Sequence, residues 1–188
     1  MRIIAGQFKG RNLASPSGTG TRPITASVKK SLFDTLAPHL EDALVVDLYA
    51  GTGTIGLEAI SRGASRVYFA ERGRGALARL AKNIETLGVA DKCTIWRGDI
   101  TAKLPGWLGR VDGPVDLAFV DPPYAQVRTW DWDSVAQAIF NPLASALAQD
   151  GLVCLRLPNK IDLPEKFGEL KLQRTKAYGD MQILFLAR

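Results

Sequence analysis

Short apolar runs alternate with amphipathic segments from residue 43 onward, and no other feature constrains the fold as strongly. Five of the runs predict strands, at residues 43–49, 65–71, 92–99, 114–120 and 151–157. Their near-continuous apolar character suits a parallel sheet that is covered on both faces. Strands alternating with helices in this way predict a doubly wound α/β domain. Two further runs, 169–178 and 181–187, predict a terminal strand pair that closes the sheet.

Hydroxyl and proline residues mark the expected helix boundaries. Thr25 and Ser27 are candidate N-caps of a helix that Pro38 ends. Later in the chain, Asn141 and Pro142 separate two helical stretches. We expect a break there, because proline lacks the N–H group that a helix interior requires.

Size and composition limit the class of protein. The chain has 188 residues, which predicts one domain with at most a small appendage. Because no apolar run has the length of a membrane span or the placement of a signal peptide, we expect a cytoplasmic protein without membrane contact. With one histidine and two cysteines outside any C-x-x-C pair, no metal site is predicted.

Basic residues are unevenly distributed along the chain. Residues 1–33 contain six of the 24 lysines and arginines and no acid, whereas the remaining 18 bases face 19 acids. The six are Arg2, Lys9, Arg11, Arg22, Lys29 and Lys30. Such a segment either attracts a polyanion, of which nucleic acid is the commonest, or is a solvated surface. Alternation at 2–13 predicts a small β-hairpin, so we divide the chain into a basic hairpin and loop (1–24) and a main domain (25–188).

A glycine-rich turn follows the first predicted strand. Gly51, Gly53 and Gly56 match the pattern G-x-G-x-x-G, which lets the backbone turn sharply and approach a ligand closely. In a nicotinamide enzyme the helix beyond such a turn receives a pyrophosphate at its N-terminus. Asp47 precedes the turn, however, and a carboxylate there disfavours pyrophosphate and suits a cation, such as the ammonium or sulfonium of S-adenosylmethionine. The glycine pattern alone does not choose between the two cofactors.

Four acids, Asp47, Glu71, Asp99 and Asp121, fall at the carboxyl ends of predicted strands. In doubly wound sheets the ligand binds at this edge, so we expect the four side chains to face one crevice. Glu71 is placed to accept the hydroxyls of a ribose. Asp99 is placed to accept an adenine amino group, although an ordinary turn aspartate fits the same position.

Asp121, Pro122, Pro123 and Tyr124 form the motif D-P-P-Y after a buried strand. The prolines fix the backbone and remove two N–H donors, which leaves the Pro122 carbonyl to point outward. Two oxygens and an aromatic ring can then hold an exocyclic NH2 group and stack on its heterocycle. Holding both N–H bonds favours a pyramidal nitrogen whose lone pair attacks a methyl group, so positioning and electrostatics supply the catalysis. Hydride transfer needs no such arrangement, and the nicotinamide interpretation is rejected.

With DLYAGTGTIGLEA and DPPY together, the chain resembles the class I S-adenosylmethionine-dependent methyltransferases that act on exocyclic base nitrogens. The segments IIAGQFKGRNL, GTRPITASVKKSLFDTL, EAISRGA and YGD narrow this resemblance. They are similar to the bacterial family that methylates N2 of one guanine in small-subunit (16S) ribosomal RNA. The resemblance covers essentially the whole chain, and it implies a Rossmann-like, mostly parallel seven-stranded sheet with a late antiparallel strand.

The same resemblance implies a set of site residues. The catalytic pocket would lie at Asp121, Pro122, Pro123 and Tyr124, and S-adenosylmethionine would contact Asp47, Gly51, Gly53, Glu71 and Asp99. The basic hairpin would grip RNA phosphates through Arg2, Lys9 and Arg11, and Arg22 and Pro23 would lie between the cofactor pocket and the RNA. Two positions depart from the family pattern, because Gly73 and Arg156 stand where an acid is common.

Two alternatives stay open from the sequence. An adenine-N6 methyltransferase acting on DNA or RNA would use the same motif, because both bases present a planar amine. A non-catalytic RNA-binding protein could keep the fold without the chemistry. The expected partner is 16S rRNA, within the small ribosomal subunit or an assembly intermediate, and a monomer is the default.

Overall fold

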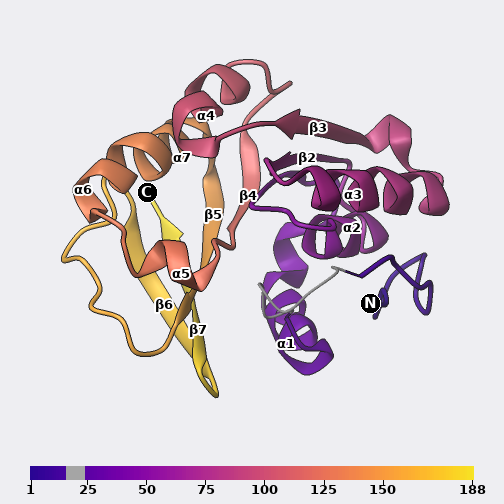
Figure 1. The fold of residues 1–188 in the computed structure, drawn as a ribbon, viewed down its shortest axis with the longest axis horizontal. Coiled ribbons are helices and arrows are strands. Elements are labelled where there is room, and N and C mark those ends of the chain that lie inside the picture. Colours follow the sequence, from indigo (N-terminus) through magenta and orange to yellow (C-terminus); the bar gives the residue numbers. More distant parts are fainter. Residues whose placement is uncertain (16–23) are drawn as a thin grey trace.

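The computed structural model describes residues 1–15 and 24–188 (Figure 1). Its helices are α1 (Ala26–Leu36), α2 (Thr54–Ser61), α3 (Arg74–Leu87), α4 (Ile100–Leu108), α5 (Tyr124–Val127), α6 (Trp132–Val135) and α7 (Asn141–Ala146). Its strands are β1 (Leu44–Leu48), β2 (Arg66–Glu71), β3 (Cys93–Arg97), β4 (Val115–Val120), β5 (Leu147–Pro158), β6 (Lys171–Tyr178) and β7 (Met181–Ala187). Shorter helical turns are also present at Ala37–His39, Ala90–Lys92 and Ala136–Phe140.

The strands form one mixed sheet in the order β3-β2-β1-β4-β5-β7-β6. Strands β1 to β5 pair in parallel, and β7 runs antiparallel to both β5 and β6. The predicted α/β class and the terminal strand pair are therefore confirmed. Strand β1 lies between β2 and β4, and the direction in which the chain adds strands to the sheet reverses there. The carboxyl ends of β1 and β4 thus form the switch point where ligands bind in such sheets.

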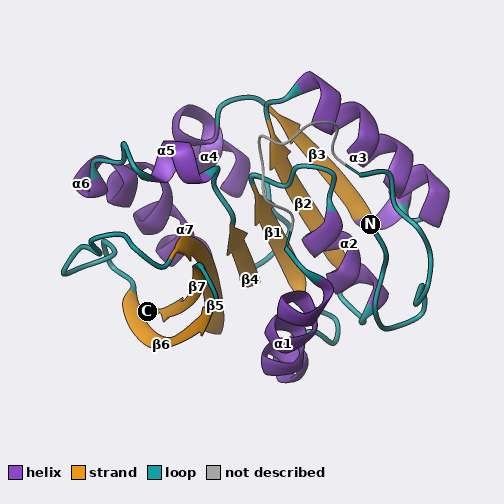
Figure 2. Cartoon of the chain, turned by 60° about the horizontal axis from the view of Figure 1, so that its bottom comes forward, coloured by secondary structure: helices purple, strands orange, loops and turns teal. Residues whose placement is uncertain are grey.

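Helices cover both faces of the sheet (Figures 1 and 2). On one face α1, α2 and α3 pack against strand residues that include Val45 and Phe119. On the other face α4 and α7 pack against residues that include Val46 and Val120. Because neighbouring strand residues point into opposite cores, both must be apolar, which explains the continuous apolar runs.

Residues 1–13 form a closed loop in which a single antiparallel bridge, between Arg2 and Asn12, replaces the two strands of the predicted hairpin. Gly6 and Gly10 adopt φ angles of 78° and 89° in the turn, and around the bridge the N–H groups of Ile3 and Leu13 donate to the carbonyls of Arg11 and Met1. Ile3 is fully buried in the same core as α1 and α2. The N-terminal segment therefore shares the core of the main domain.

The expected helix break at Asn141 and Pro142 does not occur, and this prediction is wrong. The chain stays helical from Trp132 to Ala146, passing through a π-helical turn at Ala136–Phe140. Pro142 is the second residue of α7 and directly follows the π-helical turn, where the change in hydrogen-bond spacing accommodates a residue without an N–H.

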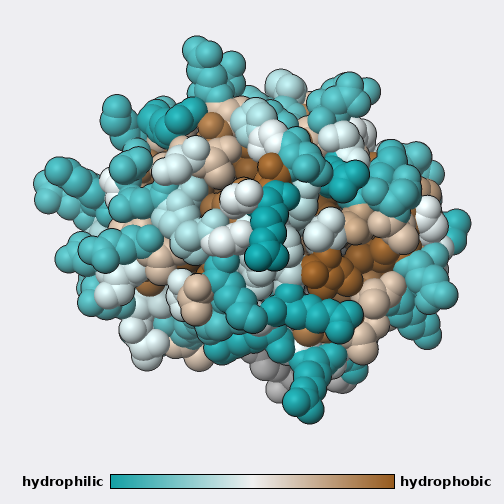
Figure 3. Space-filling view, turned by 90° about the horizontal axis from the view of Figure 1, so that it is seen from above, coloured by the Kyte–Doolittle hydropathy of each residue, from teal (hydrophilic) through white to brown (hydrophobic). Residues whose placement is uncertain are grey.

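The surface near α4 and β3 is mostly hydrophilic, and apolar side chains show there only in patches between polar ones (Figure 3). Scattered apolar side chains of this kind are usual on a folded domain. Among the helices of the described residues, none is both long and apolar enough to cross a membrane.

Candidate active site

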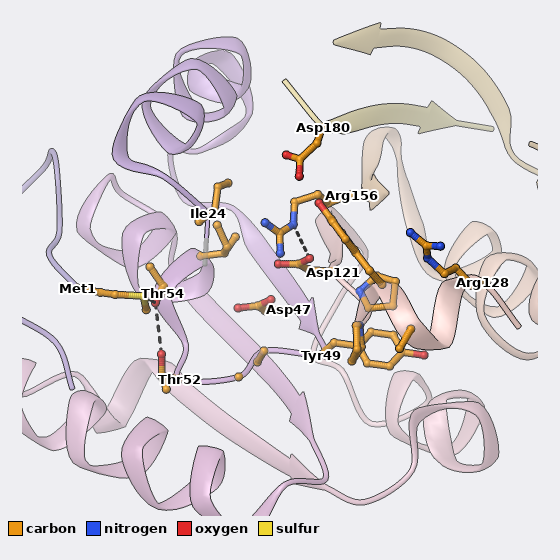
Figure 4. A pocket seen from close by; sticks show the side chains of 17 residues that line it. Met1, Ile24, Asp47, Tyr49, Thr52, Thr54, Asp121, Arg128, Arg156 and Asp180 are labelled. Atoms are coloured by element: carbon orange, nitrogen blue, oxygen red, sulfur yellow. Dashed lines mark hydrogen bonds and ion pairs between the residues drawn. The ribbon is translucent and has the colours of Figure 1, made fainter. Parts of the chain in front are cut away.

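A pocket of about 430 Å³ opens at the carboxyl ends of β1 and β4 (Figure 4). It brings Asp47 of β1 and Gly51 of the turn that follows against the motif Asp121–Tyr124 after β4. Its volume lies within the range of small-molecule sites, roughly 300–1,000 Å³. Two segments that are distant in the sequence therefore form one cavity at the switch point of the sheet.

Asp47 lies in this pocket with only 1% of its surface exposed. Its Oδ2 accepts a hydrogen bond of 2.9 Å from the backbone N–H of Gly56 in α2. Burial raises the pKa of the Asp47 carboxyl to about 8, and the neighbouring Asp121 and Glu71 act in the same direction. The group therefore carries a proton over much of the neutral pH range.

The turn after β1 depends on left-handed backbone. Gly51 and Gly53 have φ angles of 58° and 81°. A Cβ on Gly53 would lie 2.4 Å from Cδ1 of Leu80, whereas a Cβ on Gly51 would meet nothing within 4 Å. Tyr49 adopts φ 61° without being glycine, and its hydroxyl accepts a hydrogen bond of 3.2 Å from Nε2 of Gln126. A strained residue of this kind is typical of a functional site.

Glu71 is hydrogen-bonded to the backbone of the turn after β1. Its Oε2 accepts from the N–H of Gly51 at 2.9 Å, and its Oε1 accepts from the N–H groups of Arg72 and Gly73 at 2.8 and 2.7 Å. Gly73 stands where an acid is common in the family, and its backbone N–H is hydrogen-bonded to Glu71. Glu71 does not itself line the pocket.

Asp99 is the N-cap of α4. Its Oδ1 accepts from the hydroxyl of Thr101 at 2.6 Å and from the N–H of Ala102 at 3.3 Å, and Arg72 lies 3.4 Å from its Oδ2. The hydrogen bond from Thr101 is the main cause that lowers the pKa of Asp99. Asp99 does not line the pocket either, so the structure brings two of the four strand-end acids into its wall.

Asp121 forms an ion pair with Arg156 of β5, with 2.6 Å between Oδ1 and Nε (Figure 4). The Arg156 guanidinium also lies over the ring of Tyr124, 5.7 Å from its centroid. Burial raises the pKa of the Asp121 carboxyl, and the charge of Arg156 opposes this shift. In the sequence, Arg156 stands out only as a departure from a family pattern.

Several other pocket residues were missed from the sequence. They are Met1, Ile24, Tyr49, Arg128 and Asp180. Asp180 belongs to the segment YGD, which carried part of the family resemblance, and this was an available signal. No local pattern marks Met1 or Ile24, because their place in the wall depends on how the N-terminal segment packs.

Three residues expected to bind RNA, Arg2, Lys9 and Arg11, are exposed on the N-terminal segment. Arg11 also donates from Nη2 to the carbonyl of Thr86 in α3, at 2.9 Å. The fourth, Arg22, lies outside the described residues together with Pro23.

Lys29 does not belong to the basic surface that the charge count indicated. Its side chain is only 3% exposed, and its Nζ lies 2.9 Å from Oε2 of the fully buried Glu58. Glu58 also accepts the backbone N–H groups of Ile4 and Ala5, each at 3.0 Å. Lys29 thus helps to fasten the N-terminal segment, whereas Lys30 next to it is 70% exposed.

The strand order and the pocket at the ends of β1 and β4 define a Rossmann-like methyltransferase fold. The solved structure of the candidate methyltransferase yhhF from Escherichia coli matches it with a TM-score of 0.81 and 32% identity, over 100% of this chain and 97% of that chain. The family model described as Conserved hypothetical protein 95 matches residues 1–187. The chain belongs to this family of bacterial rRNA methyltransferases.

Two relatives illustrate the family. The ribosomal RNA small subunit methyltransferase D of Escherichia coli K12 is 37% identical over 183 residues, which cover 96% of this chain and 86% of the relative. YlbH of Bacillus subtilis, named as a candidate rRNA methyltransferase, is 32% identical over 181 residues, covering 95% of this chain and 94% of the relative. The similarity therefore extends over the N-terminal segment as well as the sheet.

Proposed function

We propose that the protein transfers a methyl group from S-adenosylmethionine to the exocyclic N2 of a guanine in 16S ribosomal RNA. The observation that carries this proposal is the single pocket that joins Asp47 and the glycine turn to the D-P-P-Y motif. The names of the relatives, which specify ribosomal RNA and in Escherichia coli the small subunit, support the substrate class. The choice of guanine N2 rests on the resemblance of the N-terminal segments.

The residues around the β1 turn fit S-adenosylmethionine, which supplies an electrophilic methyl group on a sulfonium. The space that a Cβ on Gly51 would enter is open, so a ligand can approach the backbone there. Asp47 would face the cationic part of the cofactor, and Gly53 would keep the turn tight. Glu71 would hold a ribose hydroxyl through Oε2, which receives one of its three backbone hydrogen bonds. Asp99 would accept the adenine amino group.

The catalytic residues would act by holding the base. Asp121 and the Pro122 carbonyl would accept the two N–H groups of N2. Pro123 would fix the direction of the chain, and its carbonyl accepts the N–H of Gln126 at 2.9 Å to begin α5. Tyr124 would stack on the base and return roughly 1–3 kcal/mol. This would offset much of the few kcal/mol needed to take the base out of its stack.

The two parts of the chain would divide the work. Residues 1–24 would hold RNA phosphates through Arg2, Lys9, Arg11 and Arg22, and residues 25–188 would carry out the transfer. Salt-dependent attraction between these cations and the phosphates would supply much of the affinity. The protein would act as a monomer in the cytoplasm, on the small subunit or an assembly intermediate.

Nucleoside analysis tests the proposed reaction. The protein is incubated with labelled S-adenosylmethionine and small ribosomal subunits that lack the modification, and the RNA is then digested. Labelled N2-methylguanosine is the expected product. Labelled N6-methyladenosine would establish the adenine alternative, which uses the same fold and mechanism. No transfer to subunits, naked RNA or DNA would favour the non-catalytic RNA-binding alternative.

Replacing Asp121 separates binding from transfer. Asp121→Ala is expected to bind S-adenosylhomocysteine as the wild type does, whereas methyl transfer falls by at least about 100-fold, as for the loss of one electrostatic stabiliser. Asp121→Asn preserves the volume of the side chain and an oxygen that can accept a hydrogen bond from Arg156, so it controls for the cavity that alanine leaves. Calorimetry and single-turnover rates measure the two quantities. Equal loss of binding and transfer in both variants would argue against a catalytic role.

A further inference from the structure

The register of two neighbouring strands brings Arg156 to the D-P-P-Y motif. Val120 of β4 pairs with Leu155 of β5 in parallel, so the residues that follow them, Asp121 and Arg156, are also neighbours. Their side chains meet at 2.6 Å and are only 23% and 12% exposed. A carboxylate with so little access to water depends on a close cation to stay ionised.

The same guanidinium contacts the aromatic part of the motif. Its carbon lies 5.7 Å from the centroid of the Tyr124 ring, and Figure 4 shows the guanidinium beside the Asp121 carboxyl. The planar guanidinium of arginine can donate hydrogen bonds from its edge while its face lies on a ring. Arg156 therefore touches both groups that would hold the substrate base.

We propose that Arg156 is a positioning residue for methyl transfer, which keeps Asp121 ionised and fixes the orientation of its carboxylate and of the Tyr124 ring. This inference rests on the proposed function. A carboxylate offers about four acceptor sites, so the bond from Arg156 to Oδ1 leaves sites for an N–H of the base. A protonated Asp121 would instead offer an O–H to the nitrogen, and this would occupy the lone pair that has to attack the methyl group.

The other groups around Asp121 do not replace Arg156. The titratable and charged side chains that line the pocket with Asp121 come from strand β1 and the turn after it, the segment after β4, strand β5 and the turn before β7. They are Asp47, Tyr49, Tyr124, Arg128, Arg156 and Asp180. The two acids, Asp47 and Asp180, supply no positive charge that could hold Asp121 ionised. Of the two cations, Arg156 forms the ion pair with Asp121.

A pH–rate profile tests the inference. Removing the guanidinium should raise the pKa of Asp121, so that less of it is ionised at a given pH and the acid limb of kcat/KM moves to higher pH. For Arg156→Gln we expect a shift of at least about one pH unit, which lowers the rate about tenfold on that limb and is recovered as the pH rises. Arg156→Lys keeps the charge and should keep the limb close to its wild-type position.

Arg128→Gln is the matched control, because it removes a cation from the same pocket but not the ion pair with Asp121. It should leave the acid limb where it is. A loss in Arg156→Gln that is equal at every pH, or an equal shift in Arg128→Gln, would overturn the inference.

A second measurement needs neither RNA nor cofactor. Titration of the Asp121 carboxyl carbon by 13C NMR, assigned with Asp121→Asn, should show a higher pKa in Arg156→Gln than in the wild type and little change in Arg156→Lys. If the wild type methylates no RNA, the proposed function fails, while this titration still reports on the ion pair. If the wild type is active and the titration does not move, the inference about Arg156 fails alone. Thermal melting of the Arg156→Lys variant shows whether a charge at this position is enough for folding.

Discussion

Proton release on cofactor binding is expected from one buried carboxyl. Burial raises the pKa of the Asp47 carboxyl to about 8. In most molecules without a ligand, this carboxyl is therefore protonated at neutral pH. A cation placed beside Asp47 favours the ionised form and lowers this pKa. Binding of S-adenosylhomocysteine, whose ammonium is cationic, should therefore release up to about one proton near neutral pH, and affinity should rise with pH until the pH passes about 8. Calorimetry in two buffers of different ionisation enthalpy measures the release. Asp47→Asn should abolish it, and because both proteins bind the same ligand, the ligand's own ionisation cancels in the comparison. Equal proton release from the two proteins would assign it to another group.

The strand-end acids show how far single residues can be interpreted from the sequence. Their position at one edge of the sheet was predictable from the strand pattern, and Asp47 and Asp121 do line one pocket. Glu71 and Asp99 instead accept nearby backbone N–H groups, which short acidic side chains readily do at turns and helix starts. The contact between Asp121 and Arg156 was not predictable, because it depends on which strands pair and in which register.

Close packing of α2 on β2 governs the stability of the elements around the glycine turn. A Cβ on Gly56 would lie 2.3 Å from Cε1 of Phe69 and 2.8 Å from Cγ1 of Val67, both buried in β2. Gly56→Ala should therefore destabilise the protein by about 1–3 kcal/mol, although alanine favours a helix by up to about 1 kcal/mol. Gly106→Ala in α4 is the matched control, because a Cβ there meets nothing within 4 Å, and it should stabilise by up to about 1 kcal/mol. Urea unfolding measures both free energies. Stabilisation by both substitutions would show that α2 can move away from the sheet.

Helices and strands were predictable where the spacing of apolar residues typical of one of them continued over several residues. The strands and the N-cap at Thr25, whose hydroxyl accepts the N–H of Val28, follow from local patterns. The hairpin expected at 2–13 is reduced to a single antiparallel bridge between Arg2 and Asn12, and the break expected at Asn141 was wrong. Glycines with positive φ interrupt the alternation in the first segment, and a π-helical turn directly before α7 lets the helix continue through Pro142 in the second.

At the scale of the whole molecule, the fold decides which basic side chains are exposed to solvent. The count of bases in residues 1–33 treated Lys29 and Lys30 alike, yet one is buried against Glu58 and the other is exposed. A sequence does not show this difference, because it depends on α1 packing beside α2. The exposed positive charge in the described part of residues 1–33 is therefore smaller than the count, and it lies on the loop formed by residues 1–13 and on Lys30 of α1.

The salt dependence of RNA binding tests this loop as an interface. Lys9 and Arg11 are exposed on the side of the sheet that α1, α2 and α3 cover, whereas Lys103 and Arg110 are exposed on or just after α4, which covers the other side. Each phosphate contact adds about 0.7–0.9 to the slope of log K against log salt, so replacing Lys9 and Arg11 by glutamine should lower the slope by about 1.5. The fall should be smaller if Arg11 keeps its bond to the Thr86 carbonyl in the complex.

Replacing Lys103 and Arg110 removes the same charge from the whole molecule and should leave the slope unchanged. Equal effects of the two pairs would mean that RNA responds to net charge alone, and an unchanged slope in the first pair would remove the N-terminal loop from the interface.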